Sequence, residues 1–558
     1  MSTVAPRTAH TALAAQRTRL RVRAVASRVV LVIAVLTALS AFRPRLWRSW
    51  GFLREVLPGL VPTTARSSLL VVAIALLLAS RGLRRGSRLA HLASVLVLTV
   101  SALLHFVEGR HSLVAGIVTA VGAVWLGAWS SAFPVLPQRR AVRRAGLLAV
   151  TGVLVLLVLV GLFSVLTLHD PHPAADLRIR HIARLVELGL SMGFLVALGW
   201  SLVAPWRPAR LGARDQHLER ERARAVVDRY GGGTLDYFAL RDDKSWFFVG
   251  QSVVAHSVRA GVCLVSPDPI GPVEEREQTW VEFLGYAHEF GWSVAVIGAS
   301  ASWLPVYEAS GLRSVYLGDE AIVDCPSFSL AGGERKSLRQ AVNRVAKGGW
   351  TTTFVDPLEL DEDGRAQIAA MSGESRHGEG ERGFSMTLSR MFDPDDAGLL
   401  LAVTRSPEGR VDAFCQFTPA AEIDGWSLDV MRRRMDVDDL PNGLIDFTIA
   451  RTIDEVVRRG QHGLGLNFAV MREVLENHPA TRFDALVRPL LQRVSATTQM
   501  SSLATFNSKY GPGWVPRFVV LDAAEFVATQ ALVMADAEGV TEIPLIGRFL
   551  ARSPRPGS

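Results

Sequence analysis

The chain has 558 residues, of which 49% are hydrophobic and 20% charged, and it is too long for one ordinary domain. Residues 1–206 hold 23 of the 61 basic residues but only 5 of the 53 acidic ones, so this part carries a net charge of about +18 and the rest about −10. The acidic second part excludes a generally basic nucleic-acid-binding domain there. Three widely spaced cysteines lack the spacing of a metal site or disulfide framework, which predicts buried free thiols and no metal.

The first part of the chain is dominated by long apolar runs. A membrane-crossing helix requires about 20 apolar residues, and six segments approach that length: 26–42, 67–80, 90–107, 113–133, 146–168 and 182–204. They predict a polytopic α-helical membrane domain over residues 1–206. Arginines cluster before the first segment and after the second and fourth. The connection after the first segment also carries four arginines within residues 43–54 and opposes this pattern, but on balance the positive-inside rule and an even number of spans place the N-terminus and the C-terminal part in the cytoplasm. The near absence of lysine beside many arginines suggests a bacterial source, and hence a bacterial plasma membrane.

The second part alternates β-branched runs with amphipathic helical patterns, which is typical of an α/β or α+β domain. A polar helix within 207–230 is expected to link it to the membrane domain. The P-loop, GxGxxG and GxSxG patterns are all missing from the sequence, so no motif supports the nucleotide-binding or hydrolase chemistry that they carry.

A helical pattern over 334–347 carries a basic face. Lys336, Asn343 and Lys347 share one side of this helix because they are separated by seven and four residues, and Arg339 adds to the patch. Such a helix in an acidic domain suits phosphate groups. A salt-bridged surface helix is the alternative.

Two further segments are richer in polar groups than a core requires. Asp319 and Glu320 stand between two strand-like runs, either in a solvated turn or as part of a site. A later loop combines Lys509 and Arg517 with Trp514. Aromatic rings beside cations suit a base or a lipid headgroup, whereas the alternative is a packed loop with its charges outward.

A carboxylate also precedes an arginine run, with Asp429 three residues before Arg432. On a helix these side chains would share a face. On a straight strand they would point to opposite faces, so their convergence requires the strand to end or to bulge there.

Together these segments resemble the phosphatidylglycerol lysyltransferases, the multiple-peptide-resistance aminoacyl-lipid synthases. The sequences of these motifs are most similar to those of the actinobacterial members of the family. The chain is expected to lack the lysyl-tRNA synthetase that is fused to some of those members. The resemblance covers about residues 230–525, and its motifs occur in family order: Gly318 to Ala321, Lys336 to Lys347, Arg382 to Ser385, Leu428 to Arg432, Asp446-Phe447, Leu466 to Ala469 and Phe506 to Tyr510.

The resemblance implies two tandem GNAT-like halves, over 231–350 and 351–535, and a C-terminal tail over 536–558. It also implies a reaction without an organic or metal cofactor, in which the hydroxyl of a membrane lipid attacks the ester of an aminoacyl-tRNA. The implied lipid is phosphatidylglycerol, and loss of its negative charge would give resistance to cationic peptides. The amino acid, the exact lipid, product flipping and assembly into a homo-oligomer stay open.

Site residues follow from the same resemblance. Asp429 and Arg432 match the Asp-x-x-Arg of the family and are expected to accept the proton of the lipid hydroxyl and to hold the lipid phosphate. The remaining substrate-binding candidates are Lys336, Arg339, Lys347, Lys509 and Arg517 for the tRNA acceptor end or the headgroup; Asp319, Glu320 and Asn467 for the α-amine or channel; and Arg382.

Two rival interpretations remain. One is a transferase with another acceptor, such as diacylglycerol or a peptidoglycan precursor. The other is a non-catalytic membrane protein that binds or transports lipid or assists envelope assembly. The paired motifs of Asp429 with Arg432 and of Lys509 with Arg517 favour an enzyme.

Overall fold

The computed structural model describes most of the chain. Described are residues 6–42, 66–108, 113–136, 142–152, 211–375, 383–437, 440–470, 500–522 and 527–538, apart from Ser389, together with isolated positions between 154 and 199. The chain divides into two compact units, one formed by residues 11–208 together with 284–293, and the other formed mainly by 209–283 and 294–558.

The N-terminal unit is helical. Its helices are α1 (Pro6–Phe42), α4 (Arg66–Arg84), α5 (Arg88–Glu108) and α6 (Leu113–Ala128), and they overlap the first four predicted spans. Among the residues described, no helix is both long enough and apolar enough to cross a bilayer, so the predicted membrane spans are not confirmed. Most of the predicted spans 146–168 and 182–204 lies outside the described residues.

The C-terminal unit is built on one mixed sheet, which confirms the predicted α/β character. Within the described ranges eleven strands form it, in the order β1-β2-β3-β4-β11-β5-β10-β9-β8-β7-β6. The strands are β1 (Ser245–Val249), β2 (Ser252–Arg259), β3 (Val262–Val265), β4 (Ser293–Ser300), β5 (Arg313–Asp324), β6 (Thr351–Val355), β7 (Leu400–Arg405), β8 (Val411–Ala420), β9 (Gly425–Arg433), β10 (Gly463–Val470) and β11 (Gly513–Leu521). The helices are α9 (Ala213–Tyr230), α10 (Arg276–Glu289), α11 (Leu304–Ala309), α12 (Lys336–Lys347), α13 (Glu362–Ser375), α14 (Leu444–Arg458), α16 (Met500–Ser508) and α17 (Val527–Ala537).

The order of elements repeats within this unit. Antiparallel strands are followed by helix, strand, helix and strand, first as β1–β3, α10, β4, α11, β5 and again as β6–β9, α14, β10, α16, β11. The last strand of each repeat pairs with a strand of the other repeat. Strand β11 of the second repeat pairs with β4 of the first, and β5 of the first repeat pairs with β10 of the second. The two exchanged strands also pair with each other. The centre of the sheet is therefore made by both halves.

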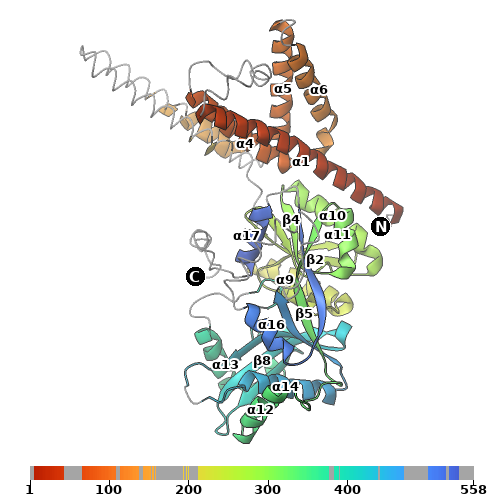
Figure 1. Ribbon diagram of the computed structural model, residues 1–558, viewed down its shortest axis with the longest axis vertical. Helices are drawn as coiled ribbons and strands as arrows, with labels where there is room; N and C mark the ends of the chain where they lie inside the picture. The colour runs from red at the N-terminus through yellow and green to blue at the C-terminus, as the bar shows by residue number, and fades with distance from the viewer. Residues whose placement is uncertain are drawn as a thin grey trace, which may run out of the picture. The chain divides into compact units, whose positions relative to one another are not determined.

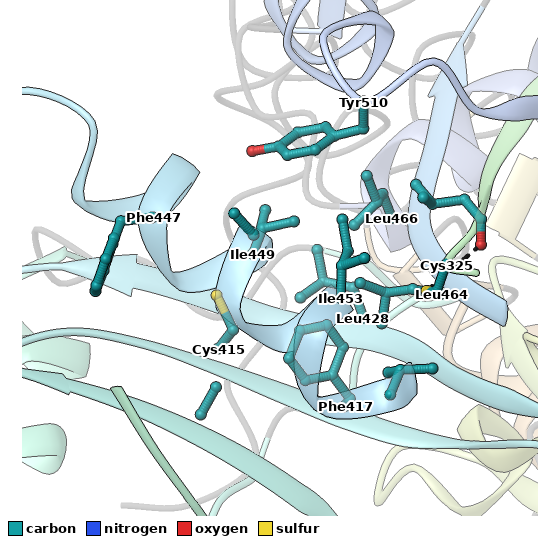
Figure 2. Close-up of a cluster of buried hydrophobic side chains, with 14 of the residues drawn as sticks. Cys325, Cys415, Phe417, Leu428, Phe447, Ile449, Ile453, Leu464, Leu466 and Tyr510 are labelled. Carbon is teal, nitrogen blue, oxygen red and sulfur yellow. Dashed lines mark hydrogen bonds between the residues drawn. The ribbon is translucent and has the colours of Figure 1, made fainter. Parts of the chain in front are cut away.

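One face of the second half is covered by α12 and α14, which lie side by side near β8 (Figure 1). Figure 2 shows the core between α14 and the strands, where Ile453 of α14 lies among Phe417, Leu428 and Leu464. Burial of each such side chain contributes about 1.5–3 kcal/mol to folding.

The basic helix has the amphipathic pattern needed to join this core. Its Leu338, Val342 and Val345 are buried at a spacing of three and four residues, which puts them on one side of the helix. The remaining side of α12 carries the basic residues. The helix α12 therefore packs against the second half of the sheet through its apolar side, and its charged side faces away from the core.

Candidate active site

Polar side chains gather on the face of the sheet opposite α12 and α14. On β9, Trp426 and Leu428 point into the core, as does Leu464 on β10. Successive residues of a strand point to opposite faces, so Ser427 and Gly465 lie on the other face.

Strands β9 and β10 separate within this face. They are parallel and pair only from Gly425 with Gly463 to Ser427 with Gly465. Beyond that point β9 continues along β8, whereas β10 continues along β5. Asp429 therefore lies where β9 has already left its parallel neighbour.

Asp429 occupies a β-bulge. Gln416 of β8 lies opposite Val430 and Phe417 lies opposite Leu428, which leaves Asp429 as the extra residue of β9. The buried carboxylate accepts hydrogen bonds from the backbone N–H of Leu388 (2.9 Å) and from Nε2 of Gln416 (2.7 Å). The bond to Gln416 places Asp429 on the face to which that glutamine points.

Arg432 lies on the same face. It is opposite Phe414, two residues along β8 from Gln416, and residues two apart on a strand share a face. The half-buried guanidinium donates to the backbone oxygen of Met431 (3.0 Å). The bulge required by the Asp-x-x-Arg spacing is thus present, and it brings Asp429 and Arg432 to one side of the strand.

A buried ion pair joins the two exchanged strands. Arg517 of β11 donates from Nη2 and Nε to Oε2 of Glu320 on β5, at 2.7 and 3.0 Å, and from Nη2 to Oγ1 of Thr234 (2.9 Å). Burial alone would lower the pKa of Arg517, but Glu320, Asp268 and Asp236 outweigh it and raise that pKa. Burial in turn raises the pKa of the Asp236 and Asp268 carboxyls.

The second oxygen of Glu320 has different surroundings. Oε1 is buried and has no hydrogen-bond partner among the residues that the structure describes. A Cβ on Gly465 would lie 3.3 Å from Oγ of Ser427 and 3.6 Å from this oxygen, so only a glycine leaves the space between them open. Among the described residues, three carboxylates, those of Glu320, Asp236 and Asp268, act electrostatically on Arg517.

These positions correct one expectation from the sequence. Asp319 and Glu320 do not form a turn between two strands, because β5 runs without interruption from Arg313 to Asp324 and both side chains are buried. Arg517 is likewise buried and paired rather than outward-facing. Compensation of Glu320 by Arg517 allows charged residues in the middle of a central strand.

The cations of α12 are arranged differently. Lys336 and Lys347 are exposed, and within the described part of the chain neither forms an ion pair. Arg339 is half-buried and donates to the backbone oxygens of Leu330 (2.7 Å) and Gly332 (2.9 Å). The alternative of a salt-bridged helix is therefore not supported, and the positive charge of α12 is available to an anionic partner.

Lys509 connects two of the sequence motifs, the one from Phe506 to Tyr510 and the one at Asp446-Phe447. Its Nζ lies 3.1 Å from both oxygens of Asp446 on α14, and the hydroxyl of the buried Tyr510 donates to the same carboxylate (2.9 Å). Burial and the neighbouring Asp446 raise the pKa of Tyr510 well above its ordinary value. The charge of Lys509 is thus largely used in holding α14 to the loop before β11.

Two predicted residues cannot be placed, and several residues were missed. Arg382 lies outside the described residues, and Asn467 falls on β10 with its side chain outside them. Gln416 was missed, although a glutamine inside the apolar run of β8 is a detectable signal. Thr234, Asp236 and Asp268 had no motif to mark them.

Comparison with known proteins identifies the family of the C-terminal part. The family model described as phosphatidylglycerol lysyltransferase, C-terminal, matches residues 224–521. The lysylphosphatidylglycerol biosynthesis bifunctional protein LysX of Mycobacterium tuberculosis is 35% identical over 334 residues, which are 58% of this chain and 28% of that protein. LysX of Rhodococcus jostii is 34% identical over 333 residues, 58% of this chain and 29% of the relative. The chain thus spans less than a third of the length of these relatives.

A solved structure shares the fold of the C-terminal unit. The L-PGS from Bacillus licheniformis is 24% identical, with a TM-score of 0.51, over 57% of this chain and 96% of the other. The residues matched by the family model include Glu320, Asp429, Arg432 and Arg517. Through this C-terminal part, the chain belongs to the phosphatidylglycerol lysyltransferase family.

Proposed function

We propose that the chain is an aminoacyltransferase that moves an amino acid from aminoacyl-tRNA to a hydroxyl of a membrane lipid, with phosphatidylglycerol as the acceptor. The observation that carries the proposal is the bulge at Asp429, which puts a carboxylate and the guanidinium of Arg432 on one face of β9. These are the two groups that activation of a phospholipid hydroxyl requires.

The roles follow from the chemistry of each group. The carboxylate of Asp429 is held by hydrogen bonds from the backbone N–H of Leu388 and from Nε2 of Gln416, and a carboxylate in this position can accept the proton of the attacking hydroxyl. Arg432 offers a planar set of donors to the lipid phosphate. The lipid oxygen forms a bond to the aminoacyl carbonyl carbon, the bond from that carbon to the tRNA ribose oxygen breaks, and the ribose oxygen takes up a proton. One ester replaces another, so the activated donor drives the reaction.

The donor has two regions to contact. The exposed cations Lys336 and Lys347 suit the phosphates of a tRNA acceptor end, because neither is engaged by an acidic side chain among the described residues. Oε1 of Glu320 suits the α-ammonium group of the amino acid, since a charge-assisted hydrogen bond would satisfy this buried oxygen.

A lipid acceptor gives the N-terminal unit its proposed role. We assign this unit to the bacterial plasma membrane, with the C-terminal unit on the cytoplasmic side, where charged tRNA is present. An added ammonium group would lower the negative charge of the envelope and thereby weaken its attraction for cationic peptides. Transfer to diacylglycerol or a peptidoglycan precursor, and lipid binding without catalysis, are the competing functions.

The test is lipid mass spectrometry on a host that lacks aminoacyl lipids and expresses the full chain. The intact chain should produce a new ninhydrin-positive lipid whose mass identifies the amino acid and the acceptor. Asp429→Ala should lower its amount by roughly 100-fold or more. Asp429→Asn is the matched control for folding, because it keeps an acceptor for the Leu388 N–H but cannot act as a base.

Isolated membranes supplied with labelled aminoacyl-tRNA test the donor separately. Transfer of label to lipid should stop when the tRNA is digested beforehand. Equal product from the intact chain and Asp429→Ala would contradict the assigned base. No lipid product, with the protein present in the membrane and charged tRNA supplied, would favour the non-catalytic function.

A further inference from the structure

Gln416 is held in one orientation beside the proposed base. The side chain is 1% exposed, and its Nε2 lies 2.7 Å from Oδ2 of Asp429. An ionised carboxylate can accept hydrogen bonds but cannot donate them. The amide nitrogen of Gln416 must therefore face Asp429, and the amide oxygen must face elsewhere. The hydrogen-bonding pattern thereby fixes both ends of this side chain.

Among the residues that the structure describes, the oxygen of this amide has no hydrogen-bond partner, and this Oε1 atom is buried. Burial of a polar atom without a partner is unfavourable, and native proteins leave few such atoms. Because Oε1 and Nε2 share one carbon atom, the unsatisfied oxygen must lie close to the Asp429 carboxylate.

The neighbouring groups form a row along one face of the sheet. Gln416 lies opposite Val430, beside the bulged Asp429, and Phe414 lies opposite Arg432 two positions further along. Two positions along a strand correspond to roughly 7 Å. A glycerol headgroup between its phosphate and its terminal hydroxyl has a comparable length. The row therefore offers a cation for a phosphate and two neighbouring acceptors for hydroxyl groups.

We propose that Gln416 determines acceptor specificity by accepting a hydrogen bond from a second hydroxyl, so that the site selects lipids whose headgroup carries a vicinal diol. This inference rests on the proposed function. One hydroxyl loses its proton to Asp429 and attacks the ester, while the adjacent hydroxyl donates to Oε1 of Gln416 and is chemically unchanged. A lipid with one hydroxyl, such as diacylglycerol, leaves that oxygen unpaired, and sites built to bind a hydroxyl discriminate strongly against analogues without it.

The experiment compares acceptors in vesicles that contain the full chain and receive aminoacyl-tRNA. The acceptors are phosphatidylglycerol and its two deoxy analogues, phosphatidyl-1,3-propanediol and phosphatidyl-1,2-propanediol, which keep the charge and one hydroxyl each. The intact chain should prefer the diol over either analogue by roughly tenfold or more in kcat/KM, because a buried acceptor is left unpaired by the analogues.

Two substitutions separate specificity from a general loss of activity. Gln416→Met keeps the length of the side chain and removes both the amide nitrogen and the amide oxygen. Loss of the hydrogen bond to Asp429 should slow transfer to all acceptors alike, and the ratio of diol to analogue in kcat/KM should fall close to one. Gln416→Glu keeps an oxygen acceptor and, when protonated, a donor for Asp429, so it should be slower but retain the preference for the diol.

The outcomes distinguish the inference from the proposed function. Equal use of the diol and an analogue by the intact chain would overturn the inference alone, and so would an unchanged ratio in Gln416→Met. Absence of aminoacylated lipid from the intact chain with every acceptor would overturn both. Because the ratio of the intact chain is decisive by itself, poor folding of a variant does not prevent the test.

Discussion

Removal of the Arg517 charge should destabilise the C-terminal unit severely. In Arg517→Met the apolar stem of the side chain is retained, but Glu320 loses both hydrogen bonds to its Oε2 and Thr234 loses its donor. Glu320 is 1% exposed, so water cannot replace the lost guanidinium. Asp236 and Asp268, which act on Arg517 electrostatically, lose a compensating charge at the same time.

The expected magnitude follows from this burial. Removal of one partner from a buried ion pair costs about 3–5 kcal/mol, because the other charge remains without compensation. Removal of both charges in Glu320→Gln/Arg517→Met should restore about 2 kcal/mol or more relative to Arg517→Met, since Glu320 is then no longer left ionised without its partner. The coupling between the two substitutions should therefore be large and favourable to the double variant.

The measurement is the free energy of unfolding of the full chain in detergent, from denaturant titration followed by tryptophan fluorescence. Arg451→Met is the matched control, because Arg451 pairs with Asp454 at the protein surface and such pairs contribute about 0–1 kcal/mol. Two results would refute this reasoning: Arg517→Met lowers the free energy of unfolding no more than this control does, or the double variant is no more stable than Arg517→Met. Either result would mean that the buried ion pair does not stabilise the pairing of β5 with β11.

Two further predictions concern charge elsewhere in the C-terminal unit. Lys336→Ala/Lys347→Ala should weaken binding of aminoacyl-tRNA and reduce the slope of log affinity against log salt by about 1.5–2; filter binding across a salt series measures this, and an unchanged slope would contradict it. Burial lowers the pKa of Lys244 from 10.5 to about 7. Between these values the unfolded chain binds a proton that the folded chain does not, so the contribution of Lys244 to stability rises with pH. Relative to Lys244→Met, the intact chain should gain stability from pH 7 to pH 10, and a constant difference in unfolding free energy would refute the assignment.

Elements with a local pattern were predictable from the sequence. The helix predicted over 334–347 is α12 (Lys336–Lys347), because the spacing of its three buried residues is set by the helix itself. The linker predicted within 207–230 corresponds to α9 (Ala213–Tyr230), which ends at the following glycines. In both cases short-range periodicity and glycine placement carry the information.

Features made by distant partners were not predictable. Glu320 and Arg517 are 197 residues apart, and nothing local shows that β11 enters the first half of the sheet. The sequence around Asp319 instead suggested a turn, because the charge that neutralises Glu320 lies on the exchanged strand. Similarly, the spacing of Asp429 and Arg432 was visible in the sequence. The bulge that brings both side chains to one face of the strand arises from pairing with β8 and was not.

The segment that follows Arg382 shows how the two halves depend on each other. Arg241 of the first half donates to the backbone oxygens of Gly383 (2.6 Å) and Thr387 (3.0 Å), and Leu388 then donates to Asp429 of the second half.

The ring of Phe384 in this segment also faces Nζ of Lys244 at 4.6 Å. The segment is therefore a physical connection from the first half to the proposed base, in addition to the exchanged strands. The position of the carboxylate depends on contacts that neither half makes alone. The described part of a motif that the sequence marked only by resemblance, Gly383 to Ser385, thus contacts the first half through Arg241 and Lys244, and Leu388, three residues further on, donates to Asp429.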